Sequence, residues 1–591
     1  MSVRFSLTIA ISATFTESSP MMTDTIDRSR DLSQPLDRLG PDERMKDTSD
    51  YLRGSIAEGL LDRITGAVPS GDDVKLMKFH GIYQQDDRDL RDERRHQKLE
   101  PAYQFMIRVR LPGGVCSPAQ WLKLDELARA HGGETLRITT RQTFQFHWVL
   151  KVSLRSIIQG LHDTLLDTVA ACGDDSRGVM CTVDPQSSQF HAEVAAMAKQ
   201  VSDHVIPKTR AYHEIWYGDE RVASSEPEEP FYGRTYMPRK FKIGFALPPS
   251  NDIDVYAQDL GFIAVGGPDG LEGFNVVIGG GMGRTDQAPE TYPRLASLIG
   301  FVPTDQVIGC ADAVMAVQRD YGDRKDRQRA RFKYTIDDKG LDWIKAEIEQ
   351  RMGTPFENAR AFTFTSNGDS YGWNSTPDGR HHRTVFIRSG RLDLRLLDAF
   401  RDIARIHRGT FRLTPNQNVI IAGVRTEDRA AIDALLTEYG LAADNVSPFR
   451  RDAIACVALP TCGLAMAESE RYLPTLLEKI EEILERNGLT DEPITLRISG
   501  CPNGCSRPYI AEIGLTGRAP GKYNLYLGGG FHGERLNRMV RENVGESVIL
   551  EVLEDTLGRY ARERAAGEHF GDFTIRAGIV CAVTEGRLFN E

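Results

Sequence analysis

The chain contains two weak copies of one sequence unit, a pattern that restricts it to folds built from two related halves. The segment L-R-I-T-T-R-Q-T-F-Q-F-H-W-V at 136–149 resembles F-R-L-T-P-N-Q-N-V-I-I-A-G-V at 411–424. Arg137 and Arg412 are 275 residues apart, and Cys181 and Cys456 have the same separation. Chance similarity between strand patterns is the alternative, but one offset shared by two landmarks disfavours it.

A third match places an insertion in the first copy. The segment G-F-N-V-V-I-G-G-G-M-G at 273–283 resembles K-Y-N-L-Y-L-G-G-G-F-H-G at 522–533, with an offset of 249. The first copy therefore contains about 26 extra residues (275 − 249), which we place around 214–236. Each copy alternates predicted strands and helices. One helix is predicted to end at Gly132-Gly133, and 136–149 alternates like a strand with a possible turn around Thr140.

Four cysteines form two pairs near the C-terminus, Cys456 with Cys462 and Cys501 with Cys505. Four thiolates can hold an iron–sulfur cubane, in which each iron needs one ligand outside the core. Zinc is the alternative, and structural zinc sites usually space paired cysteines two to four apart. The C-x3-C pair meets that spacing and the C-x5-C pair does not. Unliganded thiols are a third interpretation.

The gross composition excludes several classes of protein. The 591 residues, 40% hydrophobic and 27% charged, are typical of a globular chain of several domains, and no stretch is long and apolar enough to span a membrane. A net charge of −11 gives no support for nucleic-acid binding. Nine cysteines suit a reducing compartment, so we expect a cytoplasmic protein. The first residues faintly resemble a signal peptide, but an irregular tail or translation from Met21 or Met22 is favoured over export.

Basic side chains gather in two strand-like segments. Arg137, Arg141, Gln145 and His147 share one parity, so they would share one strand face. Farther along, Lys240 and Lys242 alternate around a phenylalanine, again on one side. A solvated sheet face and a lysine-protected edge strand are the alternatives to a lined anion pocket.

These segments together resemble the sulfite and nitrite reductase family, whose members carry a siroheme coupled to a 4Fe–4S cluster. The resemblance runs from about Asp42 to the end and is strongest to bacterial assimilatory members that draw electrons from NADPH. Its motifs are Y-L-R-G-S-I-A-E, K-F-H-G-I-Y-Q-Q-D-D-R-D, I-R-V-R-L-P-G-G-V, R-Q-T-F-Q-F-H, L-P-T-C-G-L-A-M-A-E-S-E-R, G-C-P-N-G-C-S-R and F-G-D-F-T-I-R-A-G. The resemblance implies an enzyme that reduces sulfite to sulfide with six electrons in cysteine biosynthesis.

The resemblance also assigns the cofactor residues, one siroheme and one cluster to each chain. It implies that the cluster ligands are Cys456, Cys462, Cys501 and Cys505. Cys505 would also be the axial ligand of the siroheme iron. Siroheme carries many carboxylates that need cations and amide donors. The matching positions around it are Arg137, Arg141, Gln145, Asn503 and Arg507.

On the substrate side, the resemblance implies four cations, Arg108, Arg177, Lys240 and Lys242. Our hypothesis is that the arginines hold sulfite and the lysines help to deliver protons. One departure concerns the loop around Arg177: the family usually has N-R-N, whereas this chain has S-R-G at 176–178. The contacts of that loop are therefore not predicted.

No dinucleotide-binding G-x-G-x-x-G follows an early strand, so electrons must come from another protein. The resemblance implies sulfite as substrate and, in a hetero-oligomer, a flavoprotein (alpha) partner that oxidises NADPH through FAD and FMN. The polar segment 24–44 is expected to be disordered until bound and to help dock that partner. A ferredoxin-dependent sulfite or nitrite reductase is the runner-up, and a zinc-bound structural protein belongs to a different class.

The expected architecture is α+β, an internally duplicated sulfite/nitrite reductase fold with pseudo-two-fold symmetry and cofactors at the interface of the halves. Five parts are expected. These are a flexible tail (1–45), a wrapping segment (46–99), a central ferredoxin-like domain (100–170 with 372–444), a first siroheme-side domain (171–371) and a second domain with the cluster (445–591).

Overall fold

The computed structural model describes residues 36–183, 189–208, 214–217, 220–224, 229–267, 270–442 and 446–591. Most of the predicted tail lies outside these residues. The disorder predicted for 24–44 is wrong at its end, because α1 (Pro41–Thr48) is a helix. Glu43 of this helix is buried and pairs with Lys46 of the same helix and with Arg324. Because Arg324 is 281 residues away, the second pair anchors α1 to a distant part of the chain. Within the described residues, each helix is too short or too polar to cross a membrane.

Two five-stranded sheets of the same pattern form the centre of the molecule. One has the order β1 (Ile82–Asp86), β2 (Tyr103–Arg108), β5 (Phe144–Val149), β4 (Leu136–Ile138), β15 (Arg391–Leu392). The other has the order β13 (Gly372–Ser375), β14 (His381–Val385), β17 (Val419–Val424), β16 (Thr410–Leu413), β3 (Val115–Cys116). In each sheet the last, two-residue strand comes from the other half of the chain. This exchange makes the two halves related about a pseudo-two-fold axis, as the duplication predicts.

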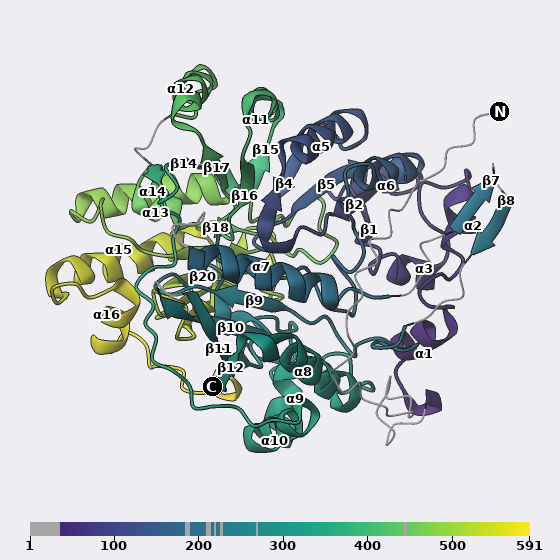
Figure 1. Ribbon diagram of the computed structural model, residues 1–591. Helices are drawn as coiled ribbons and strands as arrows, with labels where there is room; N and C mark the ends of the chain where they lie inside the picture. The colour runs from purple at the N-terminus through teal and green to yellow at the C-terminus, as the bar shows by residue number, and fades with distance from the viewer. Residues whose placement is uncertain are drawn as a thin grey trace.

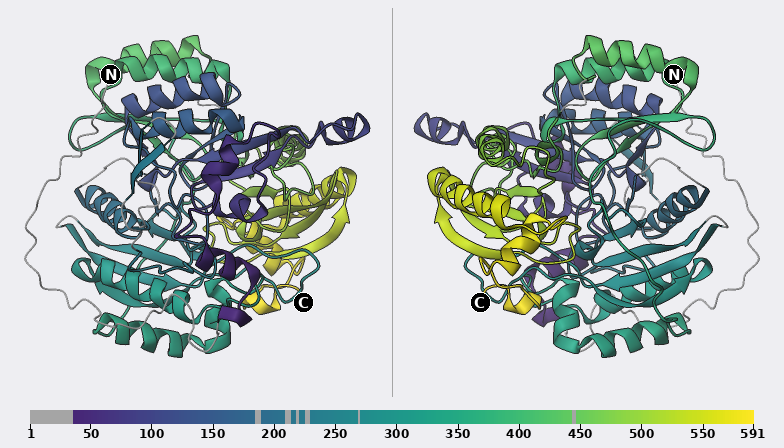
Figure 2. Two further views of the ribbon diagram at one scale, coloured as in Figure 1. Left: turned by 90° about the vertical axis from the view of Figure 1, so that its right-hand side faces the viewer. Right: turned by 90° about the vertical axis from the view of Figure 1, so that its left-hand side faces the viewer.

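Helices from both halves cover these sheets at one end of the molecule, where Figure 2 shows them stacked at the top of both views. They are α5 (Pro118–His131), α6 (Leu154–His162), α11 (Leu394–Ile406) and α12 (Arg429–Glu438). Ser117 and Gln120 form a capping box at the start of α5, and Gly132 follows its last residue, so the predicted helix end is confirmed. Trp121 of α5 packs on Phe400 of α11 at 4.9 Å between ring centroids. The two halves thus share one hydrophobic core.

The segment 136–149 is a hairpin, and the turn predicted around Thr140 is confirmed. Strand β4 ends at Ile138 and β5 begins at Phe144, with a turn that Thr139 N–H closes by donating to Thr143 O at 2.9 Å. Gln142 in this turn has a left-handed φ of 54°. Because Arg137 lies directly opposite Gln145 in the antiparallel pair, the two side chains still share one face.

Two outer sheets repeat the duplication. The first has the order β6 (Met180–Cys181), β9 (Ile243–Ala246), β10 (Leu260–Gly267), β11 (Gly270–Ile278), β12 (Ser297–Pro303). The second has the order β18 (Ile454–Ala455), β19 (Leu496–Ser499), β20 (Ile513–Ala519), β21 (Lys522–Leu527), β22 (Arg538–Val544). In both, the first three strands are parallel and the last two pairings are antiparallel. The duplicated α+β fold is therefore confirmed.

Each outer sheet packs against its own helices and has its own core. The first lobe contains α7 (Gln189–His204), α8 (Val307–Tyr321), α9 (Phe332–Lys339) and α10 (Leu341–Met352). The second contains α14 (Leu473–Arg486), α15 (Glu546–Glu563) and α16 (Phe570–Arg576). Figure 1 shows these two groups on different sides of the central sheets. A two-stranded sheet, β7 (Glu214–Tyr217) with β8 (Glu220–Ser224), lies in the insertion predicted for the first copy.

The lysine pair at 240 and 242 precedes β9, which has neighbours on both sides, β10 and β6. The alternative of an exposed edge strand is therefore wrong. Between the lysines, Phe241 is fully buried and pairs with Ser176 in the loop that carries Arg177. The remaining short helices are α2 (Ile56–Leu61), α3 (Gly71–Leu76), α4 (Arg91–His96) and α13 (Pro448–Arg451).

Candidate metal centre and anion pocket

The four C-terminal cysteines come together from two loops that end parallel strands. Cys456 follows β18, and Cys501 and Cys505 follow β19. The loops are clamped at Gly500, whose N–H donates to Cys456 Sγ at 3.2 Å and whose carbonyl accepts from Met466 N–H at 2.8 Å. The carboxyl ends of adjacent parallel strands meet at one edge of a sheet, which explains why the two pairs converge.

The thiols lie close enough to affect one another electrostatically. Burial raises the pKa of the Cys456 thiol to about 12, and the neighbouring Cys505 and Cys462 add to the rise. Burial and Cys505 raise the pKa of Cys501 and Cys462 as well. Within the described ranges, no three His, Cys, Asp or Glu side chains converge on a point that could hold one metal ion. Four thiols gathered in one region could hold a cubane, in which each thiolate binds one iron.

Cys505 differs from the other three because its side chain is exposed. Its carbonyl accepts from Thr140 Oγ1 at 3.2 Å, in the hairpin turn of the central sheet. Its thiol also acts electrostatically on Lys240, whose pKa is lowered by burial and raised by this sulfur. Cys505 therefore lies between the other thiols and a group of basic side chains.

That group is made of cations that lack a carboxylate partner. Arg141 donates to Gln258 Oε1 at 3.0 Å and to Gly178 O at 2.7 Å, and Arg177 donates to Gly173 O at 3.2 Å. Lys240 and Lys242 are half-buried beside them. Of the ion pairs found among the described residues, none involves these four side chains or Arg108. Cations gathered in this way repel one another unless an anion lies between them.

Repulsion among these side chains helps to lower the pKa of Arg141, Lys240 and Lys242. Burial, followed by Arg177 and Arg507, lowers the pKa of Arg141 to about 9. Burial and the nearby arginines lower the pKa of Lys240 and Lys242 well below the ordinary value. A lysine with a lowered pKa can give up a proton near neutral pH, which an ordinary lysine does not do readily. The pocket can therefore both attract an anion and supply protons.

Two of the predicted cofactor residues, Arg137 and Arg507, form ion pairs with carboxylates. Arg137 pairs with Glu470 at 2.7 Å and donates to Ala455 O at 2.9 Å. It therefore joins the segment around Cys456 to the central sheet. Arg507 pairs with the buried Asp254 and donates to Thr140 O at 3.1 Å, which leaves its Nη2 without a partner. Both arginines therefore have a structural role in this site.

Two more of the predicted residues, Gln145 and Asn503, contact other residues of this region. Gln145 is buried beside Arg108, its partner across β2 and β5. Asn503 donates its Nδ2 to Cys501 Sγ at 3.5 Å, so it supports a thiol directly.

Several buried polar atoms of this region have no hydrogen-bond partner within the described part of the chain. They include Nε of Arg108, Nη2 of Arg507, both ring nitrogens of His147 and both side-chain polar atoms of Gln104. Buried donors are normally satisfied, and a large ligand with many carboxylates would satisfy them. The residues present therefore fit an acidic tetrapyrrole next to Cys505.

Two residues near the substrate-side arginines were missed by the sequence analysis. Arg108 Nη1 donates to Cys172 Sγ at 3.0 Å, so Cys172 is more than a small buried hydrophobe. Burial, then Cys172, raises the pKa of Tyr83 to about 12, and Arg177 and Arg108 act in the opposite direction. Tyr83 belongs to the motif K-F-H-G-I-Y, so its place in a motif was the available signal.

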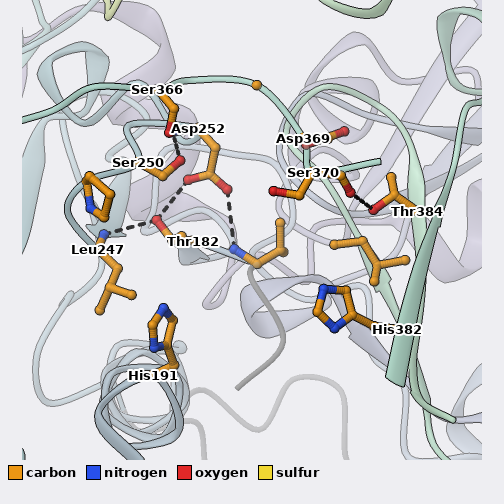
Figure 3. Close-up of a pocket in the computed structure, with 14 residues that line it drawn as sticks. Thr182, His191, Leu247, Ser250, Asp252, Ser366, Asp369, Ser370, His382 and Thr384 are labelled. Atoms are coloured by element: carbon orange, nitrogen blue, oxygen red, sulfur yellow. Dashed lines mark hydrogen bonds between the residues drawn. The ribbon is translucent and has the colours of Figure 1, made fainter. Parts of the chain in front are cut away.

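A cavity of about 200 Å³, lined by residues of both halves, lies at the position that the duplication relates to the Cys505 pocket (Figure 3). We call it the Asp252 cavity. The segment L-P-P-S-N-D-I-D at 247–254 corresponds to G-C-P-N-G-C-S-R at 500–507, with an offset of 253. Asp254 and Arg507 both have left-handed φ, 49° and 59°, at the start of matching turns. Asp252 thus occupies the place of Cys505, and it accepts from Thr182 Oγ1 at 2.8 Å. This cavity is lined by acids and hydroxyls, and its chemistry differs from that of the cation pocket.

Two family models match the chain. The nitrite/sulfite reductase ferredoxin-like half domain matches residues 96–164 and 374–439, which include most of the central sheets. The nitrite and sulphite reductase 4Fe-4S domain matches 196–356 in the first lobe. The four clustered cysteines lie outside that range, in the equivalent lobe of the second half.

Close relatives cover nearly the whole chain. A sulfite reductase (NADPH) hemoprotein beta-component of Nitrosomonas europaea is 70% identical over 96% of this chain and 99% of its own length. The protein of the same description from Staphylococcus carnosus is 55% identical over 95% and 99%. Among solved structures, the NirA protein of Mycobacterium tuberculosis has a TM-score of 0.74 at 25% identity, covering 92% of this chain and 97% of its own.

Proposed function

Because the chain belongs to the nitrite and sulphite reductase family, we propose that it reduces sulfite to sulfide in six one-electron steps, as the hemoprotein component of an assimilatory sulfite reductase. Each sulfite takes up six electrons and eight protons and releases hydrogen sulfide with three waters. The reaction therefore needs a conduit for electrons, a site for a small anion and a supply of protons. The names of the relatives support this substrate.

One observation carries the proposal. The exposed thiol of Cys505 lies between three other thiols and a pocket of cations that have no carboxylate partner in the described chain. Such an arrangement would suit an electron-accepting centre with a site for an anion beside it. Neither the group of thiols alone nor the cation pocket alone would favour a reductase.

The four thiols would hold the 4Fe–4S cluster, and Cys505 would also bind the siroheme iron. When bound, the two groups supply electron storage and a coordination site for the reducible sulfur. Arg141, Gln145 and Arg507 would contact the macrocycle, with the unpartnered Nη2 of Arg507 available for one of its carboxylates. Arg137 would act less directly, because its guanidinium is already paired with Glu470.

The chain's own residues account for the handling of substrate and protons. The guanidinium groups of Arg108 and Arg177 would hold the oxyanion. Lys240 and Lys242 would donate protons as each oxygen leaves as water, since burial and neighbouring arginines lower the pKa of both side chains. Gly178 O accepts from Arg141, so the S-R-G form of the loop keeps a contact to the pocket through its backbone.

We further infer that electrons come from NADPH by way of a flavoprotein (alpha) partner carrying FAD and FMN, in a hetero-oligomer. The relatives are named as sulfite reductase (NADPH) hemoprotein beta-components, and these names support this donor. A ferredoxin-dependent sulfite or nitrite reductase is the second candidate, because the family models that match the chain cover nitrite as well as sulphite reductases. We also propose a cytoplasmic location and the five-part domain division given above, with its central domain at 100–170 and 372–444.

The test is to purify the chain from cells that make siroheme and to record its visible absorption, iron and acid-labile sulfide. Activity is then measured as sulfide formed with NADPH plus the flavoprotein, and separately with reduced ferredoxin. We expect siroheme absorption, cluster iron and NADPH-dependent sulfide. A colourless zinc protein would contradict the whole proposal. A coloured enzyme that accepts electrons only from ferredoxin would contradict the donor alone.

A further inference from the structure

Asp175, two residues before Arg177, carries a carboxyl group that the proposed mechanism does not use. Its side chain is fully buried, and within the described chain neither carboxyl oxygen has a hydrogen-bond partner. Burial raises the pKa of this carboxyl well above its ordinary value, although nearby cations oppose the rise. Buried acids without partners are rare, and each requires an explanation.

The backbone places this carboxyl on the same side as Arg177. Ser176 forms a parallel bridge with Phe241, in which Phe241 N–H donates to Asp175 O and Arg177 N–H donates to Phe241 O, both at 2.9 Å. In such an extended segment, side chains two residues apart point in the same direction. Asp175 and Arg177 therefore lie on one face of the loop.

The carboxyl also lies against the turn that holds the guanidinium. Arg177 Nε donates to Gly173 O at 3.2 Å. A side-chain carbon added at Gly173 would come within 2.8 Å of Asp175 Oδ2, so this oxygen contacts the turn directly. Arg177 forms no ion pair with Asp175 in this arrangement, although Asp175 acts on it electrostatically.

The other groups near Asp175 are already engaged. Arg110 gives its donors to the carbonyls of Ala170, Ser176 and Ser202 and to the Ser202 hydroxyl. Asp174 accepts two hydrogen bonds from Arg327, at 2.7 and 3.0 Å. The titratable and charged groups facing Asp175 are Arg177, Arg110, Asp174, Lys46 and Tyr232. Arg177 is the one whose guanidinium also faces the anion pocket.

We propose that Asp175 is a positioning residue that sets how much of the charge of Arg177 is offered to the anion. When Asp175 is a neutral acid, the guanidinium of Arg177 is free to bind the anion. As a carboxylate it attracts the guanidinium toward the loop and weakens anion binding. Since the two equilibria are linked, binding of an anion takes up a proton at Asp175. This inference rests on the proposed function, because it takes Arg177 to be a substrate-side residue.

The test compares the cofactor-loaded enzyme with Asp175→Asn and with Asp252→Asn. Asp252 is a matched control, because it is also a buried acid and burial raises its pKa to about 7. Unlike Asp175, it lines the separate cavity shown in Figure 3. Nitrite is the probe, because its charge does not change across neutral pH as that of sulfite does. Its dissociation constant is measured from the change in visible absorption across a pH series.

For the wild type and Asp252→Asn, we expect nitrite binding to weaken by about tenfold as the pH rises through the ionisation of Asp175, within the usual range of coupling between sites. In Asp175→Asn this dependence should shrink to about twofold or less. Lys240 and Lys242 titrate in all three proteins, so the difference between the curves is the result that counts. Proton uptake on binding, measured by calorimetry in buffers of different ionisation enthalpy, should fall in Asp175→Asn alone.

Equal pH dependence in the wild type and Asp175→Asn would overturn the inference. Should Asp175→Asn not load its cofactors, Asp175→Ser removes the same ionisation in a smaller side chain and carries the same expectation. Failure of the proposed function has a different signature, since the wild type and Asp252→Asn would then also lack siroheme absorption or nitrite binding.

Discussion

Replacing Asp254 with asparagine should destabilise the contact between the two lobes more than any surface change. Asp254 is completely buried in the first lobe and pairs with Arg497 and Arg507 of the second. Both arginines are nearly buried, at 3% and 5% exposure. Burial alone raises the pKa of Asp254, but the two arginines outweigh burial and hold it below its ordinary value.

The magnitude follows from what the substitution leaves behind. Asparagine keeps the shape but removes the negative charge, so two buried guanidinium groups lose their counter-ion. Breaking a buried ion pair in this way costs about 3–5 kcal/mol. In a unit of roughly 150–250 residues, this cost lowers the melting temperature by about 6–20 °C. Since the pKa of Asp254 is lowered, its contribution is present above the ordinary pKa and is lost as the pH falls below it.

The assay is thermal unfolding of the loaded protein followed by circular dichroism, together with siroheme absorption before heating. Glu272→Gln is the control, because it breaks an exposed pair with Arg360 in which the side chains are 57% and 42% exposed. We expect no measurable shift for this control. If Asp254→Asn melts at the same temperature as Glu272→Gln, the reasoning about buried charge at the lobe contact is wrong.

Three further outcomes are expected. Cys505→Ser should abolish siroheme absorption and sulfide formation, and a variant that retains both would exclude Cys505 as the shared ligand. Lys242→Met should lower kcat for sulfite by about 10²–10⁴-fold with cofactor absorption intact, and full turnover would end its assignment as a proton donor. Burial raises the pKa of Glu512 to about 8, so the wild type should lose stability as the pH rises from the ordinary carboxyl pKa to about 8. Glu512→Gln should not show this loss in urea denaturation, and parallel curves for the two proteins would contradict it.

The sequence was sufficient to predict the duplication, because equal offsets survive where individual strands are ambiguous. It was also sufficient for the cysteines and the substrate-side cations, which the structure brings together around Cys505. The turn predicted around Thr140 is confirmed at 139–143. Alternation also identified the shared face correctly, since residues paired across an antiparallel turn preserve the parity of a continuous strand.

Other features depend on long-range contacts that no local pattern encodes. The exchanged strands β3 and β15 are two residues long, too short for any periodicity. Arg137 pairs with Glu470, 333 residues away, so its anchoring role could not be read from its neighbours. The orphan carboxyl of Asp175 is likewise visible only once the surrounding loop is folded.

The comparison of the two pockets argues for one set of cofactors in each chain. Asp252 stands where the second half has Cys505, and by sheet register Thr384 and Ile420 stand where the other sheet has Arg108 and Gln145. The Asp252 cavity thus has a carboxyl group and a threonine where the Cys505 pocket has a thiol and Arg108. A polyanionic macrocycle would find less charge compensation there than beside Cys505.

We therefore expect about five iron atoms per chain, four from the cluster and one from siroheme. The measurement is iron per polypeptide on a fully loaded preparation, with siroheme extracted and counted separately. Two sirohemes per chain would show that the acidic cavity accepts the macrocycle after all. The physical basis of the expectation would then be wrong, because a duplicated backbone would be enough to bind the cofactor without the cations that line the pocket beside Cys505.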